Sequence, residues 1–501
     1  MRSGFRAAMA WLHDWAGLVF GWLLFAIFLT GAVSYFRQEI SLWMRPELPA
    51  VRPVSTGDAI DAALGRLRRI GPGAERWMIE LPDARDPAAH IYVWQDRAPA
   101  FQREMIDPQS GAPFAPRATH GGDFLYYFHF DLQMPGVWGR LLVGIAAMAM
   151  LVAIVSGIIT HRRIFADFFT FRPWVLAPRA WLDGHNMLGV LALPYHLTIT
   201  YSGLVIFMFL YLPWGIERYY GGDFDAFEAE ALGDPPAATG PTHPAPLADL
   251  APLANAVERS WRDGAYRPRI GRIEIAHPGR SDARIVLIAG DSHHVSHARG
   301  RVVIDGVGGH ILHRDDALDN AASTFHAFYG LHLARFADPW LRWIFFLSGL
   351  GGSGMIATGL VLWVSKRRGR MPAAQGLRLV EGLNVGTIAG LIIAIGAFLA
   401  ANRLLPLAIN GRADAEAGIF FGAWALAFAH AFLRRCRSAW RAQLGVAGAL
   451  YCALPAINAL TTQRGLQASL AAADWPMAGV DLAALATGLC LLALARIAGC
   501  R

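Results

Sequence analysis

Long apolar segments alternate with polar ones along the 501-residue chain. An apolar stretch of about 20 residues can cross the hydrocarbon core of a membrane as one helix. The stretches of this kind predict eight transmembrane helices, with two long polar segments among the first four. The predicted layout in chain order is a first span at 1–36, a polar domain at 37–137, a second span at 138–163, a third at 181–212, a polar domain at 213–338, a fourth at 339–365 and a four-helix membrane extension at 381–498.

Both long polar segments have the pattern of a small α+β domain. In the first, the helix-like VSTGDAIDAALGRLRRI precedes the alternating stretches RWMIELP, AHIYVWQ and FQREMID. In the second, PLADLAPLANAVERSWRDG precedes RIGRIEIAHP, ARIVLIAG and RVVIDGVGG. Each pattern predicts one helix packed on a small antiparallel sheet. The three histidines within residues 293–297 are expected in an exposed hairpin turn of the second domain.

Composition and charge agree with a membrane protein. Hydrophobic residues make up 54% of the chain and charged residues only 17%, which is low for a soluble protein of this size. Arginine and lysine cluster in the short loops at 161–180, 365–371 and 434–441. The positive-inside rule places these loops and both termini in the cytoplasm, and both polar domains on the opposite side. In a bacterial inner membrane that side is the periplasm. None of the four cysteines lies in the polar domains, so no disulfide framework is expected there.

The segment with spans one and two resembles the segment with spans three and four. Spans one and three share a histidine and a glycine at the same spacing, and spans two and four match to within one residue. The matching stretches are His13–Gly31 with His185–Gly203, and His129–Gly157 with His332–Gly359. Because the order and orientation of the spans are the same in both halves, we predict parallel repeats related by an axis along the membrane normal.

Two histidines lie within the apolar stretch 181–204, which the pattern predicts to be one helix. A histidine in a membrane span is costly unless it is paired or acts as a ligand. His185 and His196 are 11 residues apart, so both would leave one helix face, about 16 Å apart along the axis. A pseudo-twofold axis would bring His13 to the depth of His185, on opposite sides of one site. This pattern favours axial ligands to haem iron; the alternative is hydrogen bonding to a neighbouring helix.

The other candidate histidines are assigned by their position in the repeat. His129 and His332 form a second equivalent pair that suits a second haem or a site of electron delivery, with His326 close by. Their alternative role is an interfacial position in an aromatic-rich segment. His161 competes as a ligand of the first haem, or contacts haem propionates or anionic lipid head groups. His196 has no histidine counterpart; it could ligate the second haem, line a proton path or bond the porphyrin edge.

Several motifs resemble the PepSY-associated transmembrane helix family of bacteria, over about residues 1–370. They are WLHDWAGL and LTGAVSYF in the first span, MIDPQSGAPF at the end of the first polar domain, FHF and LHL before spans two and four, and the closing SG(I/L) before a basic stop. The family includes iron-regulated inner-membrane proteins and dihaem siderophore reductases. The resemblance implies PepSY-like periplasmic domains, and b-type haem that carries electrons outward to a periplasmic ferric chelate.

The predicted fold is therefore an all-α polytopic bundle with two small α+β PepSY-like periplasmic domains and an internal parallel repeat. The predicted activity is that of a haem-b ferric-siderophore or metal-chelate reductase of the bacterial inner membrane, with two haems and no catalytic residue assigned. Without an apparent nucleotide-binding segment, its electrons would come from a separate flavin reductase or a quinol. Membrane lipid is the other expected partner, and no nucleic acid is expected. The alternatives are a chelate permease and a PepSY-type sensor or regulator. The last four spans show no buried charge beyond their ends, which argues against the permease.

Overall fold

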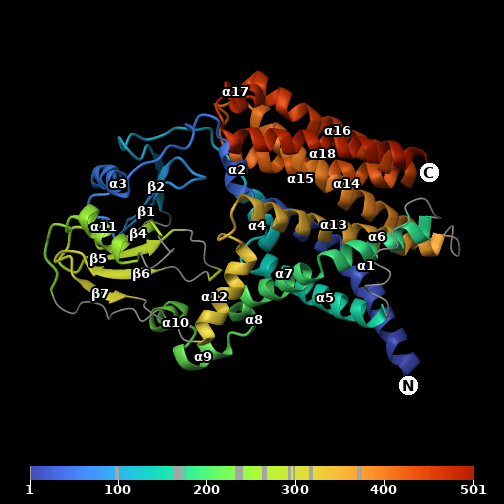
Figure 1. The fold of residues 1–501 in the computed structure, drawn as a ribbon, viewed down its shortest axis with the longest axis horizontal. Helices are drawn as coiled ribbons and strands as arrows, with labels where there is room; N and C mark the ends of the chain where they lie inside the picture. The colour runs from blue at the N-terminus through green and yellow to red at the C-terminus, as the bar shows by residue number, and fades with distance from the viewer. Residues whose placement is uncertain are drawn as a thin grey trace. The chain divides into compact units, whose positions relative to one another are not determined.

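The computed structural model describes residues 2–95, 101–161, 172, 177–231, 241–261, 268–290, 295–296, 300–314, 320–368 and 375–500. The chain forms two compact units, each assembled from separate stretches of sequence (Figure 1). The membrane unit consists of Met1–Pro46, Arg117–Phe207 and Pro339–Arg501. The sheet unit consists of Glu47–Pro116 and Met208–Asp338.

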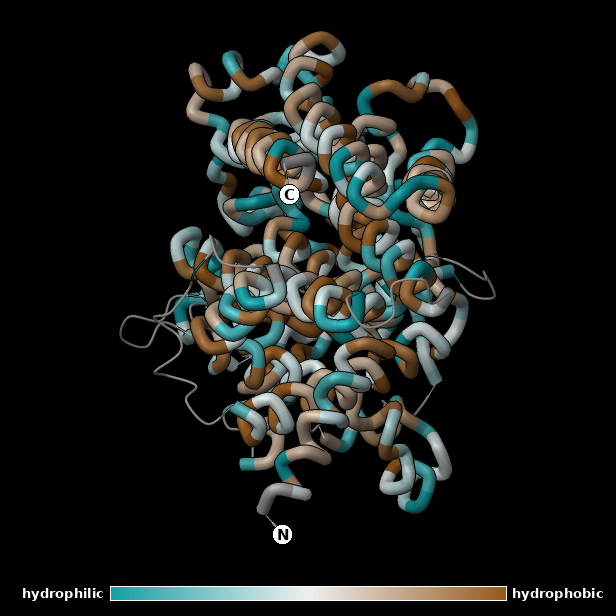
Figure 2. The backbone as a smooth tube through the Cα atoms, turned by 90° about the vertical axis from the view of Figure 1, so that its right-hand side faces the viewer, coloured by the Kyte–Doolittle hydropathy of each residue, from teal (hydrophilic) through white to brown (hydrophobic). Residues whose placement is uncertain are grey.

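Long apolar helices dominate the membrane unit. Within the described residues, seven helices are long and apolar enough to cross a membrane, and a bent pair makes an eighth if it is one span. Figure 2 shows hydrophobic residues recurring along the coiled segments of the chain. The spanning helices are α1 (Arg2–Ser34), α5 (Trp138–Thr160), the bent pair α6 (Ala177–Leu191) and α7 (Leu193–Ile206), α13 (Pro339–Arg368), α14 (Gln375–Leu404), α15 (Arg412–Leu433), α16 (Cys436–Thr461) and α18 (Trp475–Cys500). The chain is therefore a polytopic helical membrane protein, as the hydropathy pattern predicted.

Helix α1 is the central helix of this unit. It packs against α5, α13, α14 and the short helix α4 (Asp123–Asp131), while α13 also contacts α6 and α5 contacts α7. In the extension, α14 packs on α15 and α16, and α16 packs on α18. Two further short helices, α2 (Arg37–Trp43) and α17 (Leu466–Ala471), contact α18.

The third predicted span is broken. Helix α6 ends at Leu191 and α7 begins at Leu193, with an angle of 68° between them. Pro194 stands in the first turn of α7, where its missing N–H is tolerated, but the same residue cannot continue the hydrogen bonding of α6. The prediction of one continuous helix that presents His185 and His196 on one face, about 16 Å apart, is therefore wrong.

The sheet unit contains a seven-stranded antiparallel sheet with the order β3-β2-β1-β4-β5-β6-β7. Two helices, α3 (Thr56–Ile70) and α11 (Leu250–Ser260), pack against each other and against a core of aliphatic residues from the strands. The strands are β1 (Arg76–Glu80), β2 (Ala89–Trp94), β3 (Gln102–Ile106), β4 (Ile270–Ala276), β5 (Arg284–Ala289), β6 (Arg301–Asp305) and β7 (Ile311–Arg314). The remaining helices of this unit are α8 (Met208–Tyr211), α9 (Trp214–Tyr220), α10 (Phe224–Ala231) and α12 (Asn320–Leu333).

The two polar segments share this sheet. The sequence pattern predicted a separate small sheet in each, but β1 of the first segment pairs with β4 of the second, with Ile79 opposite Ile273. An edge strand leaves a row of unpaired N–H and C=O groups, and pairing the two edges satisfies both rows. The helix-plus-strands pattern of each segment is present, but the two segments form one folded unit.

Candidate functional site

The structure brings His13 of α1 and His185 of α6 together inside the membrane unit. Their ring centroids lie 6.0 Å apart, and the ring planes make an angle of 72°. The two residues are 172 positions apart in the sequence. Their positions at the start of matching stretches were the only sequence signal that they would meet.

Each of these rings is held by the same pair of contacts to a neighbouring helix. His13 Nδ1 lies 2.8 Å from the carbonyl oxygen of Ala153 on α5, and His185 Nδ1 lies 2.8 Å from that of Met355 on α13. A glycine four residues after each carbonyl makes room for the ring. A Cβ atom at Gly157 would lie 3.1 Å from His13 Cε1, and one at Gly359 would lie 3.0 Å from His185 Cε1.

These hydrogen bonds determine the tautomer of both histidines. A carbonyl oxygen only accepts, so Nδ1 carries the proton in each ring and Nε2 is left with a free lone pair. Neither Nε2 has a hydrogen-bond partner among the described residues. Metal-binding histidines show this arrangement, because the bond from the other ring nitrogen orients the ring and raises the basicity of the ligating nitrogen.

The spacing of the two rings fits a pair of axial ligands. Two imidazoles that bind one metal ion from opposite sides, at about 2.0 Å per bond, place their ring centroids about 6 Å apart. The observed distance between the His13 and His185 centroids is 6.0 Å. Edge-to-face ring packing has the same spacing, so the fit to haem iron rests on the donor set, two imidazoles with free Nε2 atoms on α1 and α6.

Aromatic and charged residues lie beside this pair on α1 and α13. Arg367 lies 3.5 Å from Asp14, the residue after His13, and its guanidinium stacks 3.9 Å from the ring centroid of Trp363. Trp363 contacts Trp15 at 6.3 Å between centroids, and Trp15 contacts Trp11 at 6.4 Å. Trp11 and Trp15 are exposed, which is typical of tryptophans at a membrane interface.

His161 lies close to the pair but uses its ring differently. Its Nε2 accepts a hydrogen bond of 2.9 Å from the side-chain amide of Asn186, the neighbour of His185. An amide N–H only donates, so the lone pair that a metal would need is already engaged. His13 is therefore a better partner for His185 than His161 is.

His129 of α4 is held by the same kind of contact at a different position on α1. Its Nδ1 lies 2.8 Å from the carbonyl oxygen of Ile27, and a Cβ atom at Gly31, four residues later, would lie 2.7 Å from its Cε1. His326 and His332 both lie on α12 of the sheet unit, where His326 packs edge-on against Phe325 at 5.4 Å between centroids. The pairing of His129 with His332 stays a prediction.

His196 lies at the bend between α6 and α7. Its side chain is 1% exposed and packs between Phe28 and the glycine-rich part of α13, where a Cβ atom at Gly352 would lie 3.1 Å from the ring. Its Nε2 lies 3.3 Å from the carbonyl oxygen of Leu188, on the other side of the bend. Among the described residues, its Nδ1 and the hydroxyl of Thr200 one turn later have no hydrogen-bond partner. The histidine therefore bridges the break and keeps one ring nitrogen unused.

A buried polar network in the extension was missed in the sequence. Asp481 of α18 is fully buried, and it accepts hydrogen bonds from the indole of Trp43 and the amide of Asn458, both at 2.9 Å. Arg403 of α14 stacks 3.8 Å from the centroid of Trp43 and donates to Asn458 at 2.8 Å. These charges lie at the ends of the spans, since Arg403 is the penultimate residue of α14 and Asp481 stands in the second turn of α18.

A second part of this network surrounds Glu416 of α15, which is also fully buried. Its carboxylate accepts hydrogen bonds from Arg412, from Asn402 and from Thr119. Arg117 donates at 2.8 Å to the carbonyl oxygen of Asn402. The two parts contain three arginines and two carboxylates, and they attach the extension to α2 and to residues 117–119. Polar residues inside otherwise apolar segments were the available signal.

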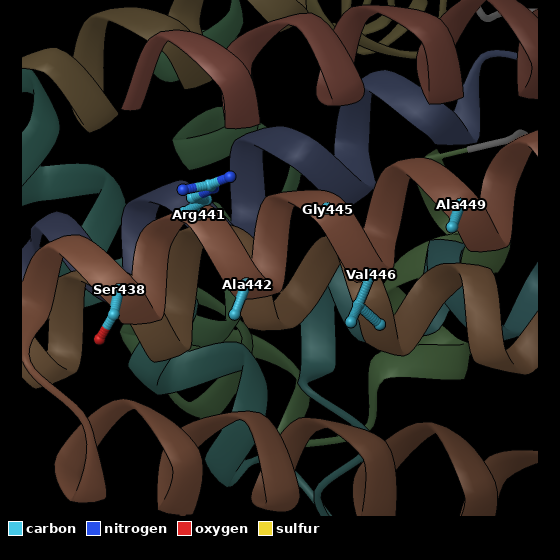
Figure 3. A pocket seen from close by; sticks show the side chains of 6 residues that line it. All are labelled: Ser438, Arg441, Ala442, Gly445, Val446 and Ala449. Atoms are coloured by element: carbon cyan, nitrogen blue, oxygen red, sulfur yellow. The ribbon is translucent and has the colours of Figure 1, made fainter. Parts of the chain in front are cut away.

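The pocket in the extension lies on a single helix. The pocket in Figure 3 is lined only by residues of one helix, α16, namely Ser438, Arg441, Ala442, Gly445, Val446 and Ala449. Small residues along a membrane helix are typical of contact with lipid or another helix. Within the described part of the chain, no group of three or more His, Cys, Asp or Glu side chains could hold a metal ion. The histidines at 293, 294 and 297 lie outside the described residues.

The fold and these residues define a multi-pass membrane protein with a half-buried histidine pair between its helices. Residues 10–366 match the family described as the PepSY-associated TM region, and the chain belongs to this family. It is also similar to the uncharacterized protein PA4219 of Pseudomonas aeruginosa, with 28% identity over 367 residues that cover 67% of this chain and 86% of that protein. The family match includes the histidine pair, and helices α14–α18 lie beyond it.

Proposed function

We propose that this protein binds haem b in its membrane unit and passes electrons across a bacterial inner membrane to a ferric siderophore or a similar metal chelate. The observation that carries the proposal is the His13–His185 pair. Both rings have a free Nε2 among the described residues, and their centroids are 6.0 Å apart, which is compatible with two ligands of one iron.

The residues around the pair would hold the two rings in place for this role. The carbonyls of Ala153 and Met355 fix the tautomer, and Gly157 and Gly359 let each ring lie close to the neighbouring helix. Haem iron, when bound, supplies a one-electron carrier whose potential depends on its axial ligands and their burial. Packing of the rings against glycine restricts their rotation and so favours a single ligand geometry.

The charges at the helix ends support a direction for electron transfer. Lys366, Arg367 and Arg368 end α13, and Arg367 reaches Asp14 next to His13. By the positive-inside rule this end and both termini are cytoplasmic, so the pair lies on the side of a cytoplasmic donor, either a flavin reductase or a quinol. The sheet unit, with its PepSY-like domains, would then be periplasmic and present the chelate.

A second haem is proposed on the periplasmic side. His129, like His13 and His185, bonds a helix carbonyl that is followed four residues later by a glycine. This shared contact supports an internal parallel repeat and a ligand role for His129. By the repeat, His332 is its partner, while His196 and His326 are further candidates. The unused Nδ1 of His196 suits a ligand or a proton carrier.

Reduction of the chelate would be a one-electron reaction at its iron. One electron from the donor converts iron(III) in the chelate to iron(II), and the chelate's oxygen ligands bind iron(II) less tightly. The metal is then released, and the chelator oxygens take up protons from the surrounding water. The chain needs no covalent intermediate for this step, only two sites at different depths.

The experiment that tests the proposal is a measurement of haem in the purified protein. Protein from haem-replete cells is expected to show a b-type absorption spectrum and a pyridine haemochrome. His13→Ala and His185→Ala should each lose about half of the haem, because each removes one of the two ligands of one site. His430→Ala is the matched control, since His430 is another membrane histidine but bonds Gln443 in the extension. A colourless wild-type protein, or full haem content in both variants, would refute the proposal.

A metal-chelate permease is the second candidate function. It is favoured by the buried Arg403, Asp481, Arg412 and Glu416, because ionisable groups inside a membrane protein often line a transport path. Reconstituted protein without haem that moves a ferric chelate across a vesicle membrane would support this alternative. Electron transfer to a chelate that stays outside the vesicle would support the reductase.

A further inference from the structure

Three aromatic rings gather on the face of the sheet opposite to α3 and α11. Tyr92 and Trp94 of β2 stack with their centroids 6.0 Å apart and an angle of 25°. Phe101, which precedes β3, contacts both rings, at 5.6 Å from Tyr92 and 5.2 Å from Trp94. Their neighbours Ile91 and Val93 belong to the core on the other face, because side chains alternate along a strand.

Two exposed arginines lie over these rings. The guanidinium of Arg76 on β1 lies 4.2 Å from the centroid of Trp94, and that of Arg103 on β3 lies 5.4 Å from the centroid of Tyr92. Arg103 also bonds His90 Nδ1 at 3.1 Å. Neither arginine is paired with a carboxylate among the described residues. We call Arg76, Tyr92, Trp94, Phe101 and Arg103 the aromatic–arginine platform.

The carboxylates near the platform already have hydrogen-bond partners. Glu80 accepts a hydrogen bond of 2.8 Å from the Tyr92 hydroxyl and one of 3.0 Å from Arg272. Burial raises the pKa of Glu80, but the Tyr92 hydrogen bond and the charge of Arg272 outweigh it, so that the pKa is lowered overall. Asp86 is bonded to His90 at 2.8 Å. No carboxylate among the described residues therefore contacts either guanidinium, and Asp86 reaches Arg103 only through the His90 ring.

The rings are held in position before any ligand binds. The hydroxyl of Tyr92 is fixed by Glu80, and the pairing of β1 with β2 places Arg76 directly opposite Trp94. The indole N–H of Trp94 has no hydrogen-bond partner within the described residues. Cross-strand aromatic contacts alone would account for the rings. They do not account for two guanidinium groups without a carboxylate partner, or for an unused indole donor beside them.

We propose that the aromatic–arginine platform binds the metal chelate, and that the chelate is an anion with aromatic rings, such as a phenolate or catecholate complex. This inference rests on the proposed reductase function for its substrate and names the class of that substrate. The chelate rings stack on the exposed Phe101, which Trp94 supports from behind, and its carboxylate or phenolate oxygens accept hydrogen bonds from Arg76 and Arg103. Charge complementarity favours this ligand over a neutral, ring-free hydroxamate chelate.

The test is a binding measurement on the full-length protein in lipid nanodiscs, oxidised and without an electron donor. The probes are iron(III) salicylate, which is anionic and aromatic, iron(III) citrate, which is anionic without rings, and iron(III) acetohydroxamate, which is neutral without rings. Equilibrium dialysis is expected to give the tightest binding for salicylate. Arg76→Gln and Arg103→Gln should each weaken it by about tenfold, because each removes one charge-assisted hydrogen bond. Trp94→Phe should keep part of the affinity, because it keeps a ring.

Arg280→Gln is the matched control, since Arg280 is an exposed arginine of the same unit that is already bonded to Asp282 at 2.9 Å. Its affinity for salicylate should stay unchanged. Equal binding of all three probes, or unchanged salicylate binding in both platform variants, would overturn the inference. Self-association of the wild type that both platform variants abolish would overturn it as well, in favour of a second copy as the occupant. Binding is measured without electron transfer, so the two proposals can fail separately. A protein that lacks haem yet binds iron(III) salicylate through the platform would refute the reductase function and leave the binding site intact.

Discussion

Gly157 of α5 and His13 of α1 pack against each other so closely that a Cβ atom at position 157 would crowd the histidine ring. That atom would lie 3.1 Å from His13 Cε1 and 3.3 Å from Nδ1. Gly359 has the same relationship to His185, at 3.0 and 3.1 Å. In both cases a glycine one turn after the carbonyl leaves room for the histidine ring that bonds this carbonyl.

Replacing either glycine by alanine should displace its histidine. In Gly157→Ala the methyl group pushes the His13 ring, and overpacking of this kind costs about 1–3 kcal/mol. We expect the variant to lose haem or to show an altered low-spin spectrum, measured by pyridine haemochrome and electron paramagnetic resonance. Gly17→Ala is the control, since Gly17 lies on α1 with nothing within 4 Å of an added Cβ. Identical spectra for both variants would argue against the glycine contact as a determinant of ligand geometry.

The buried network should matter for the stability of the membrane unit. Glu416→Gln leaves Arg412 buried without a counter-charge, and breaking a buried pair in this way costs about 3–5 kcal/mol. We expect a lower melting temperature in detergent than for Asp414→Asn, because Asp414 on the same helix is exposed at 84% of its side chain. The double replacement Arg412→Met with Glu416→Leu should recover most of the loss. Equal melting temperatures for E416Q and D414N would contradict this account.

The layout of spans could be predicted from hydropathy, since each long helix except the third appears where the apolar stretches lie. The bend at Pro194 was missed because apolar residues continue through it, and the period of the pattern does not report a change of direction. The approach of His13 to His185 followed from their matching positions. The carbonyls and glycines that hold them could not be identified, because the helix faces that meet are decided by packing and not by one segment. The role of this pair as haem ligands stays a prediction.

The joined sheet and the buried network were missed for a related reason. The pairing of Ile79 with Ile273 links strands nearly two hundred residues apart, and each strand by itself has only the local pattern of a sheet edge. Asp481 and Trp43 meet across an even longer separation. A polar residue in an apolar segment predicts that a partner exists, but it does not say which of several helices provides it.

The single sheet predicts that damage at the β1–β4 junction spreads to both segments. Ile79→Pro removes a ladder hydrogen bond at the centre of the sheet, which costs about 3 kcal/mol or more. Hydrogen exchange of the full-length protein should then show faster exchange in β5 and β6 as well as in β2. Ile311→Pro, on the edge strand β7, should accelerate hydrogen exchange only in that strand. If Ile79→Pro leaves β5 and β6 as protected as before, the two segments fold independently.

Acidification should weaken the sheet unit through Glu80. Burial raises the pKa of this carboxyl, but the hydrogen bond from Tyr92 and the charge of Arg272 outweigh it, so that its pKa in the folded chain lies below the unfolded value. A depressed pKa stabilises the fold at pH values above the unfolded pKa, about 4.3, and the stabilisation is lost as the pH falls through the folded pKa. Hydrogen exchange of β1 and β2 should therefore accelerate, relative to the intrinsic rate, below about pH 4.3.

In Glu80→Gln the same strands should be less protected at pH 7 and lose this part of the pH dependence, since glutamine does not titrate. Tyr92→Phe should shift the onset toward higher pH, because Glu80 then lacks one hydrogen bond to its charged form. An E80Q variant whose β1 and β2 protection follows the wild-type pH profile would show that another group titrates in this range.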